Sequence, residues 1–285
     1  MTEQIVRVHA GERLHAEDRL PLWELQAFLS AASFASSFVR PGQAVLDVAC
    51  GTGYLCDRLS NAGARMVVGG DIDMSAIYEA HQHCSSGQTH LLVLDGQALP
   101  FKTGSFDVVI SLETIEHLRR PEEFLAECKR VLRPGGLFIC STPNINGHFF
   151  LTKLVLTHGF LLSVVEKVPP LYRIVMNPFH LREFSQQEFR AFLEKFFAGV
   201  AVYGYRWGLP KLPRFSRLPI VGRGILEVYK FLAFVKRLLI RPPLVSLSQV
   251  AEREEFFKDF PRPFPLATRG PYCDGFVAVA QAHGS

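Results

Sequence analysis

An apolar run that ends in an acid and a two-glycine turn constrains this chain more than any other feature. The stretch at residues 45–55 is Val-Leu-Asp-Val-Ala-Cys-Gly-Thr-Gly-Tyr-Leu. Residues typical of strands surround Asp47, and Gly51 and Gly53 precede an amphipathic run, so the pattern predicts a strand, a tight loop and a helix. Glycine lets the backbone pass close to a ligand, and the first N–H groups of the helix face the same crevice. The stretch therefore predicts the first unit of a nucleotide-type site in an α/β sheet.

Two later segments repeat the pattern of a buried strand that ends in an acid. The first, at residues 66–73, is Met-Val-Val-Gly-Gly-Asp-Ile-Asp, and its Asp71 is placed to accept hydrogen bonds from a ribose diol. The second, at residues 91–97, is Leu-Leu-Val-Leu-Asp-Gly-Gln. This strand ends in Asp95, and a carboxylate or amide at that place can bind the exocyclic amine of adenine.

Two further segments complete an ordered set of five. Residues 106–118 predict a buried strand, a polar turn and a helix, and residues 128–144 predict a helix, a Pro-Gly-Gly turn and a strand. This set resembles the class I S-adenosylmethionine-dependent methyltransferases, in particular the small-molecule branch that includes the quinone and sugar methyltransferases. The resemblance covers residues 45–197 closely and the last two predicted strands more loosely.

The resemblance implies a set of residues that bind S-adenosylmethionine. They are Asp47, Ala49, Gly51, Gly53, Asp71, Ile72, Asp95, Gly96, Gln97, Ser111, Leu112 and Glu113. The first loop would shape the pocket for the methionine part, Asp71 would bind the ribose, and residues 95–97 would line the adenine. Residues 111–113 would lie below the sulfonium. Ala49 stands where the family usually has its first glycine, and because alanine is the smallest replacement we expect it to be tolerated.

A hydroxyl acceptor needs a base to remove its proton, and two histidines are candidates. His117 follows the fourth predicted strand, and His180 lies in a segment expected to close over the acceptor. A structural hydrogen bond is the competing interpretation for each. Glu113 and Glu116 are further candidates. The Asn/Asp-Pro-Pro-Tyr tetrapeptide of many amide and adenine N-methyltransferases is absent, which argues against those acceptors.

The fold that these patterns predict is an α/β, doubly wound, seven-stranded Rossmann-like methyltransferase sheet with an antiparallel last strand and helical lid insertions. Residues 1–40 are expected to form a helical cap. The cofactor-binding core is expected over 41–208 with 272–285, including helices over 146–196 that roof the substrate. Residues 198–207 and 275–282 predict the last two strands. Ser185 with Glu188 predicts a capping box for a helix that runs to about Phe197.

The segment 209–271 is a basic amphipathic insertion. It contains eight basic residues within 211–241, against Glu227 as the one acid of that range: Lys211, Arg214, Arg217, Arg223, Lys230, Lys236, Arg237 and Arg241. One interpretation is a lid helix that packs its apolar face on the core. The alternative is a peripheral contact with a membrane surface or a lipid substrate, and an anionic partner such as RNA is the weakest of the three.

Composition narrows the class of protein further. The net charge of +4 is too small to indicate a DNA-binding protein. No two of the six cysteines have metal-ligand or Cys-x-x-Cys spacing, so the sequence predicts buried thiols and no metal site. Residues 1–19 are polar and of mixed charge, unlike a signal peptide, which predicts a cytoplasmic protein that can also be peripheral at the membrane.

The sequence as a whole predicts an S-adenosylmethionine-dependent methyltransferase that acts on a small molecule. The expected acceptor is a hydroxyl of an apolar, lipid-linked, glycan or natural-product compound. Methylation of a ring carbon in a quinone-like molecule is the first alternative. A cofactor-binding partner protein without activity is an alternative of another class, and the sequence leaves the oligomeric state open.

Overall fold

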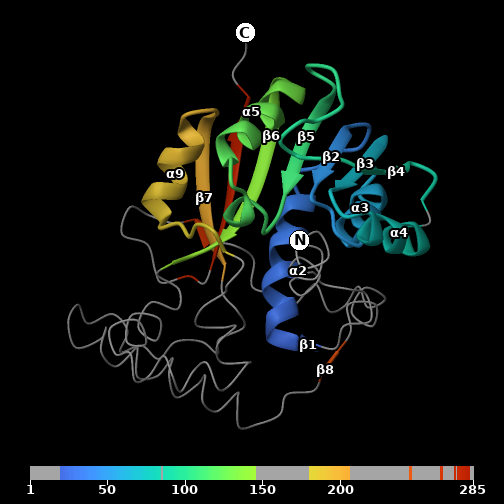
Figure 1. Cartoon of the computed structure of the whole chain (residues 1–285), viewed down its shortest axis with the longest axis horizontal. Helices are drawn as coiled ribbons and strands as arrows, with labels where there is room; N and C mark the ends of the chain where they lie inside the picture. The colour runs from blue at the N-terminus through green and yellow to red at the C-terminus, as the bar shows by residue number, and fades with distance from the viewer. Residues whose placement is uncertain are drawn as a thin grey trace, which may run out of the picture.

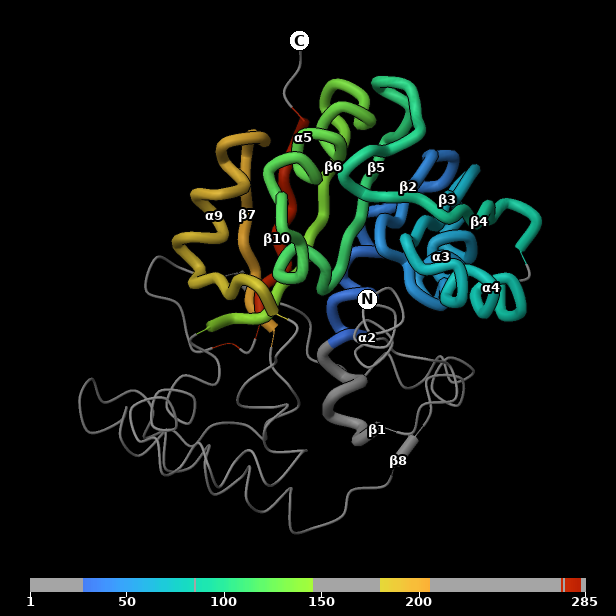
Figure 2. Tube along the Cα trace, in the orientation of Figure 1, coloured from blue at the N-terminus to red at the C-terminus, as the bar shows by residue number. Residues whose placement is uncertain are grey.

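The computed structural model describes residues 20–84, 86–145, 180–205, 244–245, 264–265, 273 and 275–282. A mixed sheet forms its centre, with the strand order β4-β3-β2-β5-β6-β10-β7-β9. The strands are β2 (Ala44–Val48), β3 (Met66–Asp71), β4 (Thr89–Val93), β5 (Phe106–Ser111), β6 (Leu132–Pro143), β7 (Ala198–Tyr205), β9 (Phe264–Pro265) and β10 (Gly275–Gln281). Strands β2 to β6 pair in parallel, while β10 lies between β6 and β7 and is antiparallel to both (Figure 2).

This arrangement confirms the predicted doubly wound sheet of seven strands with an antiparallel last strand. The two-residue β9 adds an eighth at the edge of β7, which the sequence did not predict. Helices cover the sheet, as Figure 1 shows: α2 (Leu22–Ser36), α3 (Tyr54–Asn61), α4 (Met74–His83), α5 (Pro121–Val131) and α9 (Gln186–Glu194).

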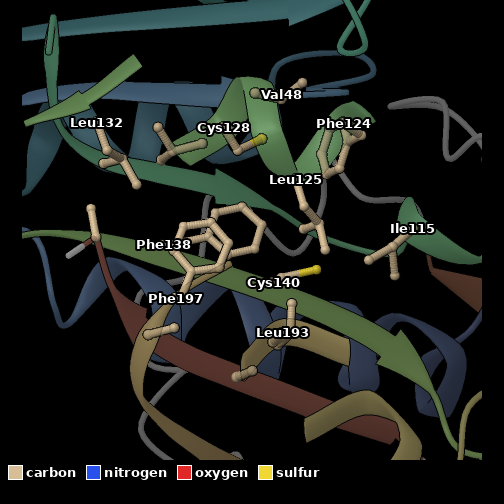
Figure 3. Close-up of a cluster of buried hydrophobic side chains, with 14 of the residues drawn as sticks. Val48, Ile115, Phe124, Leu125, Cys128, Leu132, Phe138, Cys140, Leu193 and Phe197 are labelled. Carbon is tan, nitrogen blue, oxygen red and sulfur yellow. The ribbon is translucent and has the colours of Figure 1, made fainter. Parts of the chain in front are cut away.

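Alternating side chains on each strand send one set of residues to each face of the sheet. In β2, Leu46 and Val48 join a core cluster with Phe124 of α5, whereas Val45 joins a second cluster with Leu55 of α3. The first cluster also holds the stacked rings of Phe138 in β6 and of Phe197, the residue before β7, seen in Figure 3, whose centroids lie 4.7 Å apart. Two buried layers therefore fix β2, whose carboxyl end carries the glycine loop.

Helix α9 lies within the range expected to roof the substrate, but it packs against the sheet instead. Its Phe189, Phe192 and Leu193 are buried in the same cluster as α5, because apolar residues recur at helical spacing along one face. The predicted capping box is confirmed, with Ser185 and Glu188 each bonded to the other's backbone N–H. The other residues of the expected roof, 146–179, lie outside the described residues.

The expected cap and the basic insertion are described only in part. Helix α2 falls within the cap, and the preceding β1 (Leu20–Pro21) pairs antiparallel with β8 (Leu244–Val245) of the insertion, a pairing that the sequence did not predict. The basic range 211–241 lies outside the described residues. Among the helices that are described, none is both long and apolar enough to cross a membrane.

One local prediction is wrong. The helix expected directly after β5 is only a short 3₁₀ turn, η1 (Ile115–His117), and the α-helix begins at Pro121. Proline fits the first turn of a helix and disfavours helical geometry in the residue before it, so Pro121 starts a new helix after Arg120. His117 therefore ends a tight turn at the sheet edge.

Candidate functional site

In the loop after β2, three of five successive residues have a left-handed backbone conformation. Ala49, Gly51 and Gly53 have φ of 63°, 53° and 79°. The backbone N–H groups of Ala49 and Cys50 both donate to the carbonyl of Gly70 on β3, at 2.7 and 3.1 Å. A Cβ added at Gly51 would meet nothing within 4 Å, so the loop faces open space there. Ala49 occupies a conformation that suits glycine, which explains in physical terms why the family usually has glycine at this position.

Asp71 joins this loop to the end of β3. Its side chain is buried, and its carboxylate accepts the N–H of Gly51 at 3.0 Å and the N–H of Asp73 at 2.9 Å. Asp73 in turn caps α4 by accepting the N–H of Ser75 at 2.8 Å. The acid expected to bind ribose therefore also holds the glycine loop in place, while the neighbouring acid has the structural role of a cap.

Asp47 lies under the loop in the interior of the sheet. The pKa of its carboxyl is raised to about 7, mainly by burial. A hydrogen bond from the Cys56 thiol acts in the opposite direction, and the negative charge of Asp71 contributes to the rise. Because the two acids lie together at the ends of β2 and β3, this edge of the sheet is suited to a cationic ligand. The amino group and sulfonium of the expected cofactor carry such charge.

The loop after β4 has the groups needed to bind an adenine edge. Asp95 accepts the backbone N–H of Gln97 at 2.8 Å, and this turn fixes the side chain of Gln97, whose amide nitrogen lies 3.3 Å from the same carboxylate oxygen. The amide oxygen Oε1 of Gln97 is buried and has no hydrogen-bond partner among the described residues. At the neighbouring strand end, Ile72 exposes 66% of its surface. An unsatisfied acceptor near an exposed apolar side chain fits the amine and the flat face of a purine.

The next strand end carries a strained glutamate. Glu113 follows β5 by two residues and has a φ of 51°. Its carboxylate oxygen Oε1 accepts hydrogen bonds from the hydroxyls of Ser141, at 2.6 Å, and Tyr205, at 2.9 Å. A Cβ at Gly275 would lie 2.2 Å from the Tyr205 hydroxyl, so glycine at this point of β10 lets the tyrosine ring reach across the strand. Strain of this kind is typical of functional sites.

Beside Glu113, the last residue of β5 and the residue that follows it are buried. Ser111 is fully buried, and its hydroxyl has no hydrogen-bond partner within the part of the chain that is described. Leu112 is also buried. These two residues lie in the interior, at the same carboxyl edge of the sheet as the glycine loop, Asp71 and Glu113.

The structure brings the two predicted histidines together. The ring centroids of His117 and His180 are 5.0 Å apart, and Glu116 Oε1 lies 3.6 Å from His117 Nε2. Glu116 is buried, its other oxygen accepts the hydroxyl of Thr142 at 3.0 Å, and its backbone carbonyl accepts the N–H groups of Leu181 and Arg182. These contacts attach the segment at 180 to the turn at 115–117.

This cluster also contains the donor atoms of a cation site. One ligand atom from each of Glu116, His117 and His180 lies within 4.8 Å of the other two. Imidazole and carboxylate groups are common ligands of divalent metals. Sequence spacing could not reveal the group, because 62 intervening residues separate its two halves. The sequence therefore predicts each histidine as a candidate base but does not predict that the two lie together beside a buried carboxylate.

Comparisons with known proteins agree with this geometry. Residues 46–140 match the family model described as "Methyltransferase domain". A probable S-adenosylmethionine-dependent methyltransferase of Mycolicibacterium smegmatis is 35% identical over 153 residues, which cover 54% of this chain and 51% of that protein. A ubiquinone biosynthesis O-methyltransferase of Maricaulis maris is 35% identical over 127 residues, which cover 43% of this chain and 50% of that protein.

These two matches mean that the chain spans about half the length of the curated relatives it matches. The fold also resembles a solved structure from Thermotoga maritima, described as an S-adenosylmethionine-dependent methyltransferase and possible histamine N-methyltransferase. That likeness has a TM-score of 0.54 at 18% identity and covers 92% of this chain and 91% of the other. At this identity the likeness concerns the fold alone.

Proposed function

Because the chain belongs to the class I S-adenosylmethionine-dependent methyltransferases, we propose that it moves the methyl group of S-adenosylmethionine to a hydroxyl of a small-molecule acceptor. The observation that carries the proposal is the convergence of the strand ends. Three groups of residues lie along the carboxyl edge of one sheet: the turn with Gln97 and its unpaired amide oxygen, the glycine loop with Asp71, and the paired histidines. A cofactor beside the first two would lie next to an acceptor beside the third.

The cofactor-binding roles follow the order of the strands. In the proposal, Asp47 and the loop over 49–53 surround the methionine part, and Asp71 accepts hydrogen bonds from the ribose hydroxyls. Ile72 covers one face of the adenine while residues 95–97 bind its edge. Ser111, Leu112 and Glu113 line the wall beside the sulfonium. The buried Oε1 of Gln97 supports this assignment because an unpaired buried acceptor gains a partner when a purine amine binds.

The sulfonium, when bound, supplies an electrophilic methyl group, and the residues of this chain supply position and proton transfer. The acceptor oxygen attacks the methyl carbon as the carbon–sulfur bond breaks, and the hydroxyl proton must pass to a base. We assign that base to the pair His117 and His180. The carboxylate of Glu116, 3.6 Å from His117 Nε2, favours the protonated imidazolium that results.

The relatives and the sequence support one class of acceptor. The relative from Maricaulis maris is a ubiquinone biosynthesis O-methyltransferase, which supports an apolar or lipid-linked hydroxyl acceptor for this chain. Methylation of a quinone-like ring carbon remains the alternative within the same branch. The basic segment 211–241 supports a further proposal, that the protein contacts an anionic membrane at its periphery to reach such an acceptor.

Methyl transfer can be tested before the acceptor is known. The protein is incubated with S-adenosylmethionine carrying an isotope-labelled methyl group and with lipid and metabolite extracts. A labelled product that is heavier by one methylene group, absent without the protein, is the expected result. Tight cofactor binding with no labelled product from any extract would favour the competing class, a binding protein without activity.

The base assignment is tested on the acceptor so found. Replacing His117 or His180 with Ala should lower turnover by roughly 10²–10⁴-fold while the affinity for S-adenosylhomocysteine is unchanged, because the imidazole is needed only when the proton leaves. His90→Ala, an exposed histidine on β4, is the control. Full activity in both single variants would move the assignment to Glu113.

A further inference from the structure

One face of α5 holds the loop that contains the predicted adenine-binding residues. The guanidinium of Arg130 donates to the backbone carbonyls of Leu99, at 2.9 Å, and Phe101, at 2.7 Å. Glu127 accepts the N–H of Leu99 at 2.8 Å. Three backbone groups of an irregular loop are thus satisfied by two side chains of a helix about thirty residues later in the chain.

The two side chains also bind each other in a fixed geometry. Arg130 Nε lies 2.7 Å from one carboxylate oxygen of Glu127, and Arg130 Nη2 lies 2.8 Å from the other. A planar guanidinium can make this forked contact and still reach two carbonyls, which the single ammonium of lysine cannot do. The pair is half-buried, with side chains 33% and 22% exposed, so it is less screened than a surface ion pair.

A third contact from the same helix face reaches the turn itself. A Cβ at Gly96 would come within 3.0 Å of the Phe124 ring of α5. Phe124, Glu127 and Arg130 recur at intervals of three, so they lie along one side of the helix. Side chains of α5 therefore contact the turn at Gly96 and the following loop at Leu99 and Phe101.

We propose that Glu127 and Arg130 are positioning residues for the adenosine half of the cofactor. They touch no part of the expected ligand. They act by holding residues 95–101 so that Asp95 and Gln97 meet the adenine edge. The inference rests on the proposed function, since it assumes that this turn binds adenine. A positioning role differs from a purely structural one in what it predicts. If the two residues position the turn, then replacing either of them weakens the binding of every ligand that contains adenosine.

Calorimetric titration of two ligands separates these roles. S-adenosylhomocysteine contains the whole cofactor frame, and 5′-methylthioadenosine lacks the amino-acid part. Arg130→Gln should weaken both by about tenfold, by the same factor, because the lost contacts act on the adenosine half alone. Arg130→Lys, which keeps the charge, should recover part of the loss. Arg120→Gln is the matched control, since Arg120 forms an exposed ion pair with Glu123 at the start of the same helix.

A double-mutant cycle with Gln97→Ala then tests the route of the effect. If Arg130 acts through the turn, the loss in the double variant should be clearly smaller than the product of the two single losses. If the losses of affinity in the two single variants simply multiply in the double variant, the inference is overturned. It is also overturned if the variants melt at a lower temperature but keep both dissociation constants. A loss of affinity for S-adenosylhomocysteine alone would overturn it as well. If Arg130→Gln does not fold, Arg130→Lys and Glu127→Gln serve in its place. Wild-type protein that binds neither ligand would instead refute the proposed function.

Discussion

At the scale of single residues, the buried carboxyl of Asp47 makes the stability of the folded protein depend on pH. It lies beside Asp71 beneath the glycine loop, and its pKa in the folded protein is about 7, raised from 3.8 mainly by burial. In the unfolded chain the group is exposed to water and returns to its ordinary pKa. The folded protein therefore holds this proton more tightly than the unfolded chain does.

The sign of the effect on stability follows from that difference. Folding stability relative to an Asp47→Asn variant should be highest below about pH 4 and should fall by a few kcal/mol as the pH rises to about 7, because the folded protein must then ionise a buried group. Urea unfolding of both proteins at several pH values across this range measures the difference in their free energies of unfolding. The other titrating groups are the same in both proteins, so their effects cancel. Parallel stability profiles for the two proteins would contradict the account.

Residues of the cofactor loop could be predicted from sequence because each follows a recognisable strand. Asp71 and Gly51 lie side by side, because Asp71 accepts the N–H of Gly51, and their binding of a cofactor stays a prediction. The network of Glu113, Ser141 and Tyr205 could not be predicted, because it depends on β10 lying between β6 and β7 and on the absence of a side chain at Gly275. Such contacts arise from tertiary packing and leave no local pattern in the sequence.

At the scale of elements, α9 is determined both by its local sequence and by its packing. Its capping box fixes where the helix begins, and three buried apolar residues attach it to the sheet. The short turn η1 shows the opposite case, because the helix predicted within residues 106–118 begins only at Pro121. The capping box made the start of α9 predictable, whereas the layer that a helix covers depends on partners distant in sequence.

The capping box makes a quantitative prediction. Ser185→Ala should lower the free energy of unfolding by about 1 kcal/mol, because the N–H of Glu188 loses its acceptor at the start of α9. Glu188→Gln should lose less than Glu188→Ala, since glutamine can still accept from the N–H of Ser185. Urea unfolding measures all three variants. Equal stability of Ser185→Ala and the wild type would show that packing alone fixes this helix.

At the scale of the whole molecule, the sheet brings the proposed cofactor side and the proposed acceptor side to one edge. In the proposal, β2, β3 and β4 form the cofactor side, and η1 with the segment at residues 180–184 forms the acceptor side. The insertion 209–271 contributes β8 next to β1 and β9 next to β7. Its basic range lies outside the described residues, so the proposed membrane contact rests on its sequence.

Vesicle binding tests that contact on the intact protein. Each Lys or Arg close to an anionic surface contributes on the order of 1 kcal/mol, so several together should give weak attachment that high salt removes. We expect sedimentation with anionic vesicles at low salt, and little with neutral vesicles or at high salt. A variant in which Lys230, Lys236 and Arg237 are changed to Gln should stay in solution. Equal behaviour with both kinds of vesicle would favour an ordinary lid.

The central claim is that the edge formed by β2 and β3 binds the cofactor, and calorimetric titration with S-adenosylhomocysteine tests it most directly. The wild type should bind, and Asp71→Ala should lose roughly 2–4 kcal/mol of binding free energy, because two charge-assisted hydrogen bonds to the ribose disappear. Asp73→Asn, which can still cap α4, should bind like the wild type. A wild type that releases no heat, or an Asp71→Ala variant that binds equally well, would contradict the account.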